Sequence, residues 1–276
     1  MISFAILALS QSLVAQLAEP VRLDGFKIVF QELDLKDRVI VRGEMIALGG
    51  RVYVFRNSDK EIQIHDPKLK TIELIDLGRK VRSRVLYARL DSSKARLEKA
   101  IERSIAKKLA TGVKHDELIA KMTRNLIEPA FVVTRDEAKG SSRLVNANVE
   151  IDAKGTRSLD AARLAVVAEV LRFQVGLQSE RYPTKIPPFP RLEALRELTE
   201  TRRLLPTEIK FVYRLTGEPF RERYTYEFVP ELSRRERDAI PRIIELERTA
   251  PFLTFDAYEG LEQGKSKSEP AEDPGK

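Results

Sequence analysis

Cysteine and tryptophan are absent from this chain of 276 residues, and histidine occurs only twice. Without cysteine the protein has no disulfide, no thiolate nucleophile and no cysteine-ligated zinc or iron–sulfur site. A histidine-based metal site needs three or four converging ligands, and neither His65 nor His115 has the neighbours for one. We interpret His65 as part of a surface turn and His115 as part of a helix N-terminus. We therefore expect no metal and no cofactor.

Signatures of the common enzyme classes are also missing. The sequence has no Gly-x-Ser-x-Gly turn, no phosphate-binding glycine loop and no dinucleotide-binding glycine pattern. Ser104 and Lys107 have the Ser-x-x-Lys spacing of penicillin-recognising acyl enzymes, but the other motifs of that class are absent. We interpret this match as accidental. A hydrolase with dispersed carboxylates is a third hypothesis, which no spacing in the sequence favours. We expect a protein that is not an enzyme.

Positive charge is concentrated in one segment. The chain has a formal net charge of +7, and 33% of its residues are charged. Between Gly78 and Lys108 there are eleven basic and three acidic residues, a net +8 that exceeds the whole chain's excess. Such a segment favours an anionic partner, although solvated helix faces are also rich in charge. Tyr87 is its only aromatic residue, so we do not expect stacking with nucleic acid bases.

The first eighteen residues contain no charged side chain. An apolar stretch of this length that ends in small residues is typical of a secretory signal, although basic residues are missing from its start. We predict a signal peptide over residues 1–18 and a periplasmic or secreted protein. The alternative is a buried N-terminal helix in a cytoplasmic protein. No other stretch has the roughly 20 apolar residues of a transmembrane helix, so we expect none.

The remaining chain alternates between strand and helix patterns. Short alternating segments joined by turns predict an antiparallel meander from Phe26 to Leu77. A basic helical insertion is expected at about residues 91–127, with Asp91 or Ser92 as the N-cap. Further strands are predicted over 130–134 and 144–151. A nearly all-apolar, buried helix follows over 159–177, and a closing hairpin over 209–228.

These patterns predict an α+β fold, in which a curved antiparallel sheet, shaped like an unclosed barrel, packs on the buried helix. We expect one domain over residues 19–261 and a disordered tail over 262–276, where glycine, serine, lysine, glutamate and proline predominate.

The order of strands and turns resembles the Lol-type family of periplasmic lipoprotein carriers. The segments that carry the resemblance run from Arg51 to Val81 and from Leu204 to Phe228, the second being similar to a proline-initiated closing hairpin. The resemblance covers Phe26 to Leu77 and Phe131 to Phe228. It implies an unclosed barrel with an apolar cavity. The sequence departs from such carriers in its large basic insertion and its few aromatic residues.

Two functional hypotheses follow. The first is an exported, non-catalytic carrier or binder of a lipid, an acyl chain, a lipidated protein or another apolar ligand, held between the curved sheet and the buried helix. Its predicted lining residues are Leu164, Val167, Leu171, Phe211, Tyr213, Tyr224 and Tyr226. The second is an envelope-associated module that docks on an anionic polymer, lipid headgroups or an acidic protein. Its predicted contact residues are Arg82, Arg84, Lys99 and Arg103.

Overall fold

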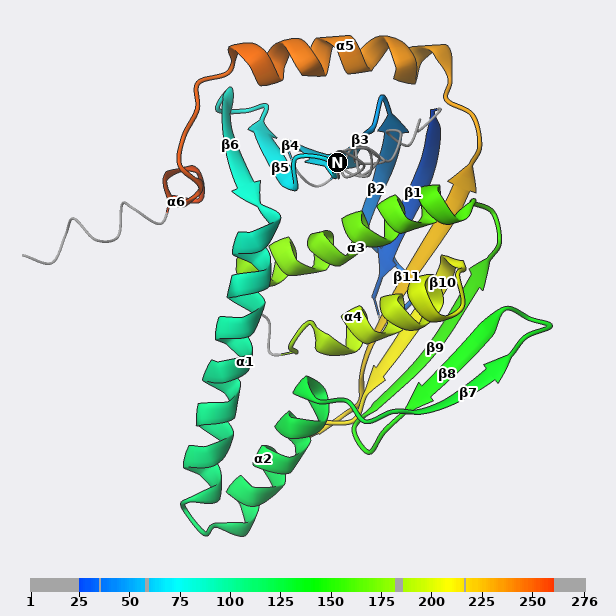
Figure 1. Cartoon of the computed structure of the whole chain (residues 1–276). Coiled ribbons are helices and arrows are strands. Elements are labelled where there is room, and N and C mark those ends of the chain that lie inside the picture. Colours follow the sequence, from blue (N-terminus) through cyan, green and yellow to red (C-terminus); the bar gives the residue numbers. More distant parts are fainter. Residues whose placement is uncertain (1–24, 35, 58–59, 182–185, 216, 261–276) are drawn as a thin grey trace, which may run out of the picture.

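One antiparallel sheet of eleven strands forms the centre of the protein (Figure 1). The computed structural model describes residues 25–34, 36–57, 60–181, 186–215 and 217–260. The predicted signal peptide and the predicted tail therefore lie outside the described residues. The strands are β1 (Phe26–Leu33), β2 (Val39–Leu48), β3 (Arg51–Arg56), β4 (Glu61–Asp66), β5 (Thr71–Asp76), β6 (Val81–Leu86), β7 (Val132–Asp136), β8 (Ser141–Val145), β9 (Val149–Thr156), β10 (Leu205–Tyr213) and β11 (Phe220–Val229).

The sheet is open, and its two halves meet at β1 and β11. The strand order is β6-β5-β4-β3-β2-β1-β11-β10-β9-β8-β7, so β6 and β7 lie at opposite edges. Phe30 of β1 is the cross-strand partner of Tyr226 of β11, although the two residues are far apart in the chain. An α+β protein with a curved antiparallel sheet that does not close is therefore confirmed.

Six α-helices and one π-helical turn are found in the described residues. They are α1 (Tyr87–Leu109), α2 (Lys114–Ile127), α3 (Ala161–Arg181), α4 (Phe189–Arg196), the π-helical turn η1 (Glu197–Thr201), α5 (Arg234–Thr249) and α6 (Phe255–Tyr258). The helix α5 has no counterpart in the sequence-based prediction. Its N-terminus carries a capping box, in which Ser233 and Glu236 each satisfy the other's backbone N–H.

The basic segment is divided between a strand and a helix. Residues 81–86 form the edge strand β6, which the sequence analysis missed, and α1 begins at Tyr87 rather than near Asp91. No side chain caps this helix. Tyr87 and Leu90 are buried against the sheet and α3, so tertiary packing outweighs the capping preference of Asp91. The helical insertion therefore covers residues 87–127.

A turn divides the strand that was predicted over residues 144–151. The side-chain oxygen of Asn146 accepts hydrogen bonds from the backbone N–H groups of Asn148 (2.9 Å) and Val149 (2.8 Å). Asparagine favours such turns because its side chain replaces a backbone acceptor. The result is the hairpin of β8 and β9.

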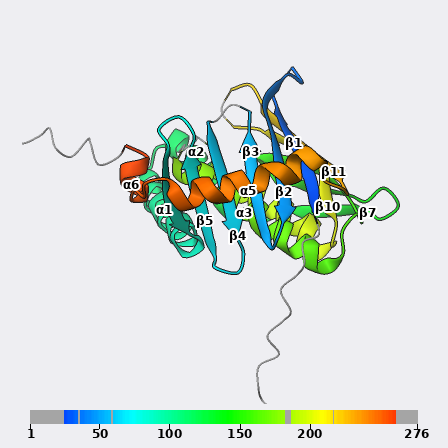
Figure 2. The ribbon, with the colours of Figure 1, turned by 90° about the horizontal axis from the view of Figure 1, so that it is seen from above.

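Both faces of the first half of the sheet are covered. On one face, Ile62 and Ile64 of β4 share a cluster of buried side chains with Ile240 and Ile243 of α5, which crosses the strands in Figure 2. On the other face, the largest cluster of buried apolar side chains includes residues of α3, β1, β2, β3, β9 and β10. The pocket described next lies at this second face.

Candidate functional site

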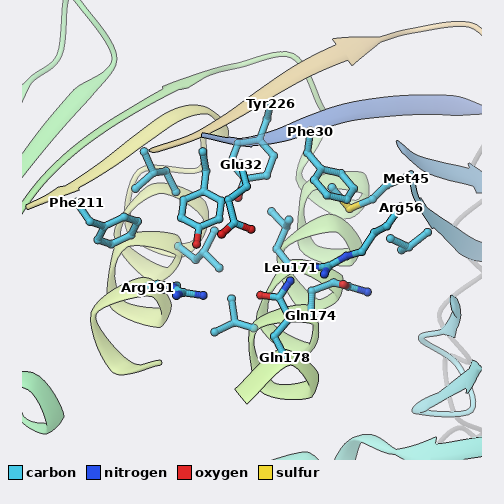
Figure 3. Close-up of a pocket in the computed structure, with 15 residues that line it drawn as sticks. Phe30, Glu32, Met45, Arg56, Leu171, Gln174, Gln178, Arg191, Phe211 and Tyr226 are labelled. Atoms are coloured by element: carbon cyan, nitrogen blue, oxygen red, sulfur yellow. The ribbon is translucent and has the colours of Figure 1, made fainter. Parts of the chain in front are cut away.

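A small pocket lies between the sheet and the helices α3 and α4 (Figure 3). Its volume is about 60 Å³, and it is partly open to solvent. Typical ligand sites hold about 300 Å³ or more, whereas one water needs about 10–15 Å³ of such space. The pocket therefore has room for a terminal group of a ligand and not for an enclosed acyl chain.

Aromatic side chains from three neighbouring strands form one wall. Alternation along β10 and β11 directs Phe211, Tyr224 and Tyr226 to the same face. Phe30 of β1 stands opposite Tyr226 in the strand register. The rings of Phe211 and Tyr224 meet edge to face, with 6.0 Å between their centroids. Such packing fixes the shape of the wall.

The seven predicted lining residues divide into two groups. Leu171, Phe211, Tyr224 and Tyr226 line the pocket. Leu164, Val167 and Tyr213 lie in the same cluster of buried side chains but do not line the pocket. Tyr213 follows Phe211 on the same face of β10, with 5.8 Å between the ring centroids.

Arg191 of α4 brings a cation to the pocket. Its Nη2 atom donates a hydrogen bond to Glu222 Oε1 at 3.0 Å, and its guanidinium lies 5.6 Å from the centre of the Tyr224 ring. Burial raises the pKa of the Glu222 carboxyl, although the Arg191 charge acts in the opposite direction. Arg191 is thus neutralised by a carboxylate, but its Nε atom is buried without a hydrogen-bond partner.

Arg56 at the end of β3 is the second cation. The Gln178 amide contacts its guanidinium, and with the amide oxygen turned toward Arg56 it accepts from Nη1 and Nη2. The Arg56 Nε atom is buried and has no hydrogen-bond partner, and among the described residues no carboxylate lies within ion-pair distance of Arg56. Glu32 of β1 also lines the pocket, and Figure 3 shows its side chain on the same side of the pocket as Tyr226. The pocket thus combines an aromatic wall with charged groups of both signs.

Sequence reasoning missed these charged residues, although two of them left a signal. Val52, Val54 and Arg56 alternate along β3, and the first two are buried in the main cluster. Phe30 and Glu32 alternate in the same way along β1. A charged residue at the next inward-facing position of an apolar strand indicates a polar site in the core. Arg191 left no such signal.

A buried polar network adjoins the pocket. His65 lies in β4 and is fully buried, so the prediction that it belongs to a surface turn was wrong. Its ring lies between the Gln174 amide, at 2.7 Å from Nε2, and the Tyr87 hydroxyl, at 3.3 Å from Nδ1. Burial lowers the pKa of His65 to about 3. His115 is exposed in the first turn of α2.

Metal-binding chemistry finds no support in the described ranges. These ranges contain no group of three or more histidine, aspartate and glutamate side chains arranged to hold a metal ion. They also contain no helix that is both long and apolar enough to cross a membrane.

The four residues of the predicted basic surface occupy two different environments. Arg82 and Arg84 of β6 both pair with Glu73 of β5, whose side chain is only 3% exposed. Arg82 also donates to the Ala250 carbonyl at 3.1 Å. Lys99 and Arg103 instead lie on the exposed face of α1. Arg82 and Arg84 are therefore held by an ion pair with Glu73, whereas Lys99 and Arg103 pair with no carboxylate of the described residues.

Comparison with known proteins adds no assignment. No family model matches the chain, and no curated protein matches it either.

Proposed function

We propose that this chain is an exported, non-catalytic binding protein whose pocket holds the anionic end of an amphipathic molecule. One observation carries the proposal. A single pocket joins an aromatic wall to two arginines whose Nε atoms are buried without hydrogen-bond partners. A buried polar group without a partner is costly, so a bound anion that accepts from it is favoured. The Lol-type resemblance is compatible with an apolar ligand.

Arg56 is the residue that we assign to the ligand's anionic group. Arg191 already pairs with Glu222, whereas the polar partner of Arg56 among the described residues is the neutral Gln178. Hydrogen bonds to charged groups contribute about 1.5–3 kcal/mol. The adjoining Phe30 and Leu171 offer apolar contact to the first carbon atoms of the ligand. Each buried methylene contributes about 0.8 kcal/mol. The rest of an acyl chain remains outside the pocket, because about 60 Å³ does not hold it.

Titration with a dansyl-labelled fatty acid tests the proposal. We expect saturable binding that is displaced by an unlabelled fatty acid and not by the fatty alcohol of equal length. Arg56→Gln should weaken binding about tenfold or more, because the charged hydrogen bond is lost. Arg234→Gln is the matched control, since the Arg234 side chain is 95% exposed on α5.

A second variant tests the place of binding. Leu171→Trp fills the pocket with a larger side chain and should abolish displacement. Its fold is checked by circular dichroism and by its urea midpoint. Equal displacement by acid and alcohol, or unchanged binding in Arg56→Gln, would refute the assignment of Arg56. Absence of saturable binding by the original chain would refute the proposed function itself.

A further inference from the structure

The helices α1 and α2 form a hairpin that projects beyond the sheet (Figure 1). Ile105, Ala120 and Ile127 are buried between its two helices, together with Phe189 of α4. The linker of residues 110–113 lies at the far end, where Gly112 adopts a positive φ of 64°. Glycine allows this left-handed conformation, with which the chain leaves α1. The tip of the hairpin is defined here as residues 107–121.

Three apolar side chains are exposed at the tip. Leu109, Val113 and Leu118 are 44%, 51% and 53% exposed. Exposed apolar residues that are scattered singly are ordinary, but a group of them marks a binding surface. Leu118 lies on the outer face of α2, because the buried Ala120 and Ile127 define the opposite face.

Lysines surround the same tip. Lys114 and Lys121 lie four residues before and three residues after Leu118, and therefore share its face of α2. Lys107 stands in the last turn of α1, two residues before Leu109. Long lysine side chains can lie along an apolar contact while their ammonium groups stay in water or near phosphates.

A row of cations continues from the tip along α1. Arg96, Lys99, Arg103 and Lys107 are spaced by three, four and four residues, so they share one face of the helix. Glu98 and Glu102 lie on a different side. Among the described residues, one ion pair links α1 to α2, and it joins Lys108 to Asp116. None of the four residues of the row pairs with a described carboxylate.

We propose that the tip of the α1–α2 hairpin docks on a lipid bilayer that contains anionic phospholipids. The exposed leucines and valine would enter the headgroup layer, and Lys107, Lys114 and Lys121 would meet lipid phosphates. Apolar side chains combined with lysines are the usual signature of interfacial binding, which reaches about 5–10 Å into the membrane. A soluble polyanion would gain nothing from Leu118, which is why the observations favour the bilayer. This proposal does not depend on the pocket.

If the tip docks on the bilayer, the contribution of each cation to binding should decrease along the row from Lys107 to Arg96. The helix rises 1.5 Å per residue, so Arg96 lies about 20 Å from Leu109 along the axis and Lys107 about 3 Å. The Debye length at physiological salt is about 8 Å, and a lysine near an anionic surface contributes about 1 kcal/mol. Lys107→Ala should therefore weaken binding about fivefold. Arg96→Ala should change it less than about twofold.

Vesicle co-sedimentation of the full chain measures both effects. The vesicles contain phosphatidylcholine alone or phosphatidylcholine mixed with phosphatidylglycerol. We expect binding to the mixed vesicles that weakens as salt rises. Leu118→Asp should weaken it about tenfold or more, whereas Leu69→Asp is the matched control, at a 59% exposed site between β4 and β5. Residues 1–24 are identical in all variants, so differences between variants report the hairpin.

Three outcomes would overturn the proposal. Equal losses in Arg96→Ala and Lys107→Ala, with tight binding to heparin, would indicate a linear polyanion along the row. A concentration-dependent dimer that Leu118→Asp disperses in gel filtration would indicate that a second copy covers the tip. Vesicle binding that is unchanged by Leu118→Asp, in a variant with the original circular dichroism spectrum, would show that the tip does not enter the bilayer.

Discussion

The side-chain amide of Gln174 in α3 donates to the ring of His65 in β4, with 2.7 Å between the two Nε2 atoms. An amide nitrogen can donate a hydrogen bond but cannot accept one, so His65 Nε2 is the acceptor. The His65 ring is therefore neutral, with its hydrogen on Nδ1. The same amide also donates to Gln63 Oε1 at 2.5 Å. Gln174 lines the pocket, so this network connects the pocket to the core beneath it.

The buried His65 predicts acid sensitivity. Its pKa is about 3 in the folded protein, against a usual value of 6.5. Below pH 6.5 the unfolded chain therefore binds a proton that the folded protein does not, and stability falls as pH decreases toward 3. The loss approaches about 1.4 kcal/mol per pH unit in this window. Between pH 7 and pH 5 we expect a decrease of about 2 kcal/mol in the free energy of unfolding from this residue.

Urea unfolding of the original chain and of His65→Gln at both pH values isolates this contribution. Glutamine does not titrate, so the variant should lack the His65 part of the decrease, even if it is less stable at pH 7. The control His115→Gln changes an exposed histidine and should keep the full decrease. An equal decrease in the original chain and in His65→Gln would contradict the prediction.

Local patterns predicted much of the sheet because alternation, turn residues and burial agree there. The strands from Phe26 to Asp76 and the hairpin of β10 and β11 follow the expected order. The edge strand β6 was missed because its charged residues suggested a solvated segment, whereas Arg82 and Arg84 are held by Glu73 of the next strand. This role becomes visible only when β6 is paired with β5.

The pocket was predictable only in part. Leu171 and the tyrosines of β11 follow from the apolar faces of their elements. The position of Arg191 depends on how α4 lies over the sheet, which its own sequence does not determine. His65 was misplaced because Asp66 and Pro67 indicate a turn, but β4 continues through Asp66. The alternation of Gln63 and His65 shows instead that polar side chains meet α3.

Glycine is required at position 43 because Phe30 of β1 and the backbone of β3 leave no space for a side chain there. A Cβ atom at this position would lie 2.3 Å from Phe30 Cζ and 2.4 Å from the Phe55 carbonyl oxygen. The carbonyl belongs to the backbone and cannot move freely. We expect Gly43→Ala to destabilise the protein by about 1–3 kcal/mol through overpacking, as measured by urea unfolding. It should also displace Phe30 and so weaken dansyl fatty acid binding. Gly78→Ala is the control, because its nearest neighbour is a side-chain oxygen at 3.2 Å.

Arg191 and Glu222 are expected to be strongly coupled. Their side chains are 15% and 11% exposed, so Arg191→Met leaves a carboxylate that is largely buried and unpaired. Removing one partner of such a pair costs about 3–5 kcal/mol. Arg191→Met combined with Glu222→Gln should recover part of this loss. A double-mutant cycle in urea gives the coupling energy, and additive effects of the two substitutions would contradict the prediction.

The same variant predicts a pH dependence of opposite sign to that of His65. Without Arg191, burial raises the pKa of Glu222 further, because the opposing charge is removed. The folded variant then binds a proton that the unfolded chain releases above its usual pKa of 4.5. Stability of Arg191→Met should therefore fall as pH rises above 4.5. If the free energy of unfolding changes with pH in the same way in the original chain and in Arg191→Met between pH 4.5 and 7, the prediction is contradicted.

Glu73 is expected to hold the β6 edge and to mask its positive charge. It accepts from Arg84 Nε and, at 3.4 Å, from Arg82 Nη1, while its own side chain is 3% exposed. Glu73→Gln keeps the shape but removes the charge, so we expect a loss of about 1.5–3 kcal/mol in urea unfolding. The uncompensated arginines should also increase retention on heparin. Glu231→Gln, at an exposed position, adds the same unit of net charge and should change stability by less than about 0.5 kcal/mol. Equal heparin retention in the two variants would show that net charge alone, rather than release of Arg82 and Arg84, accounts for the increase.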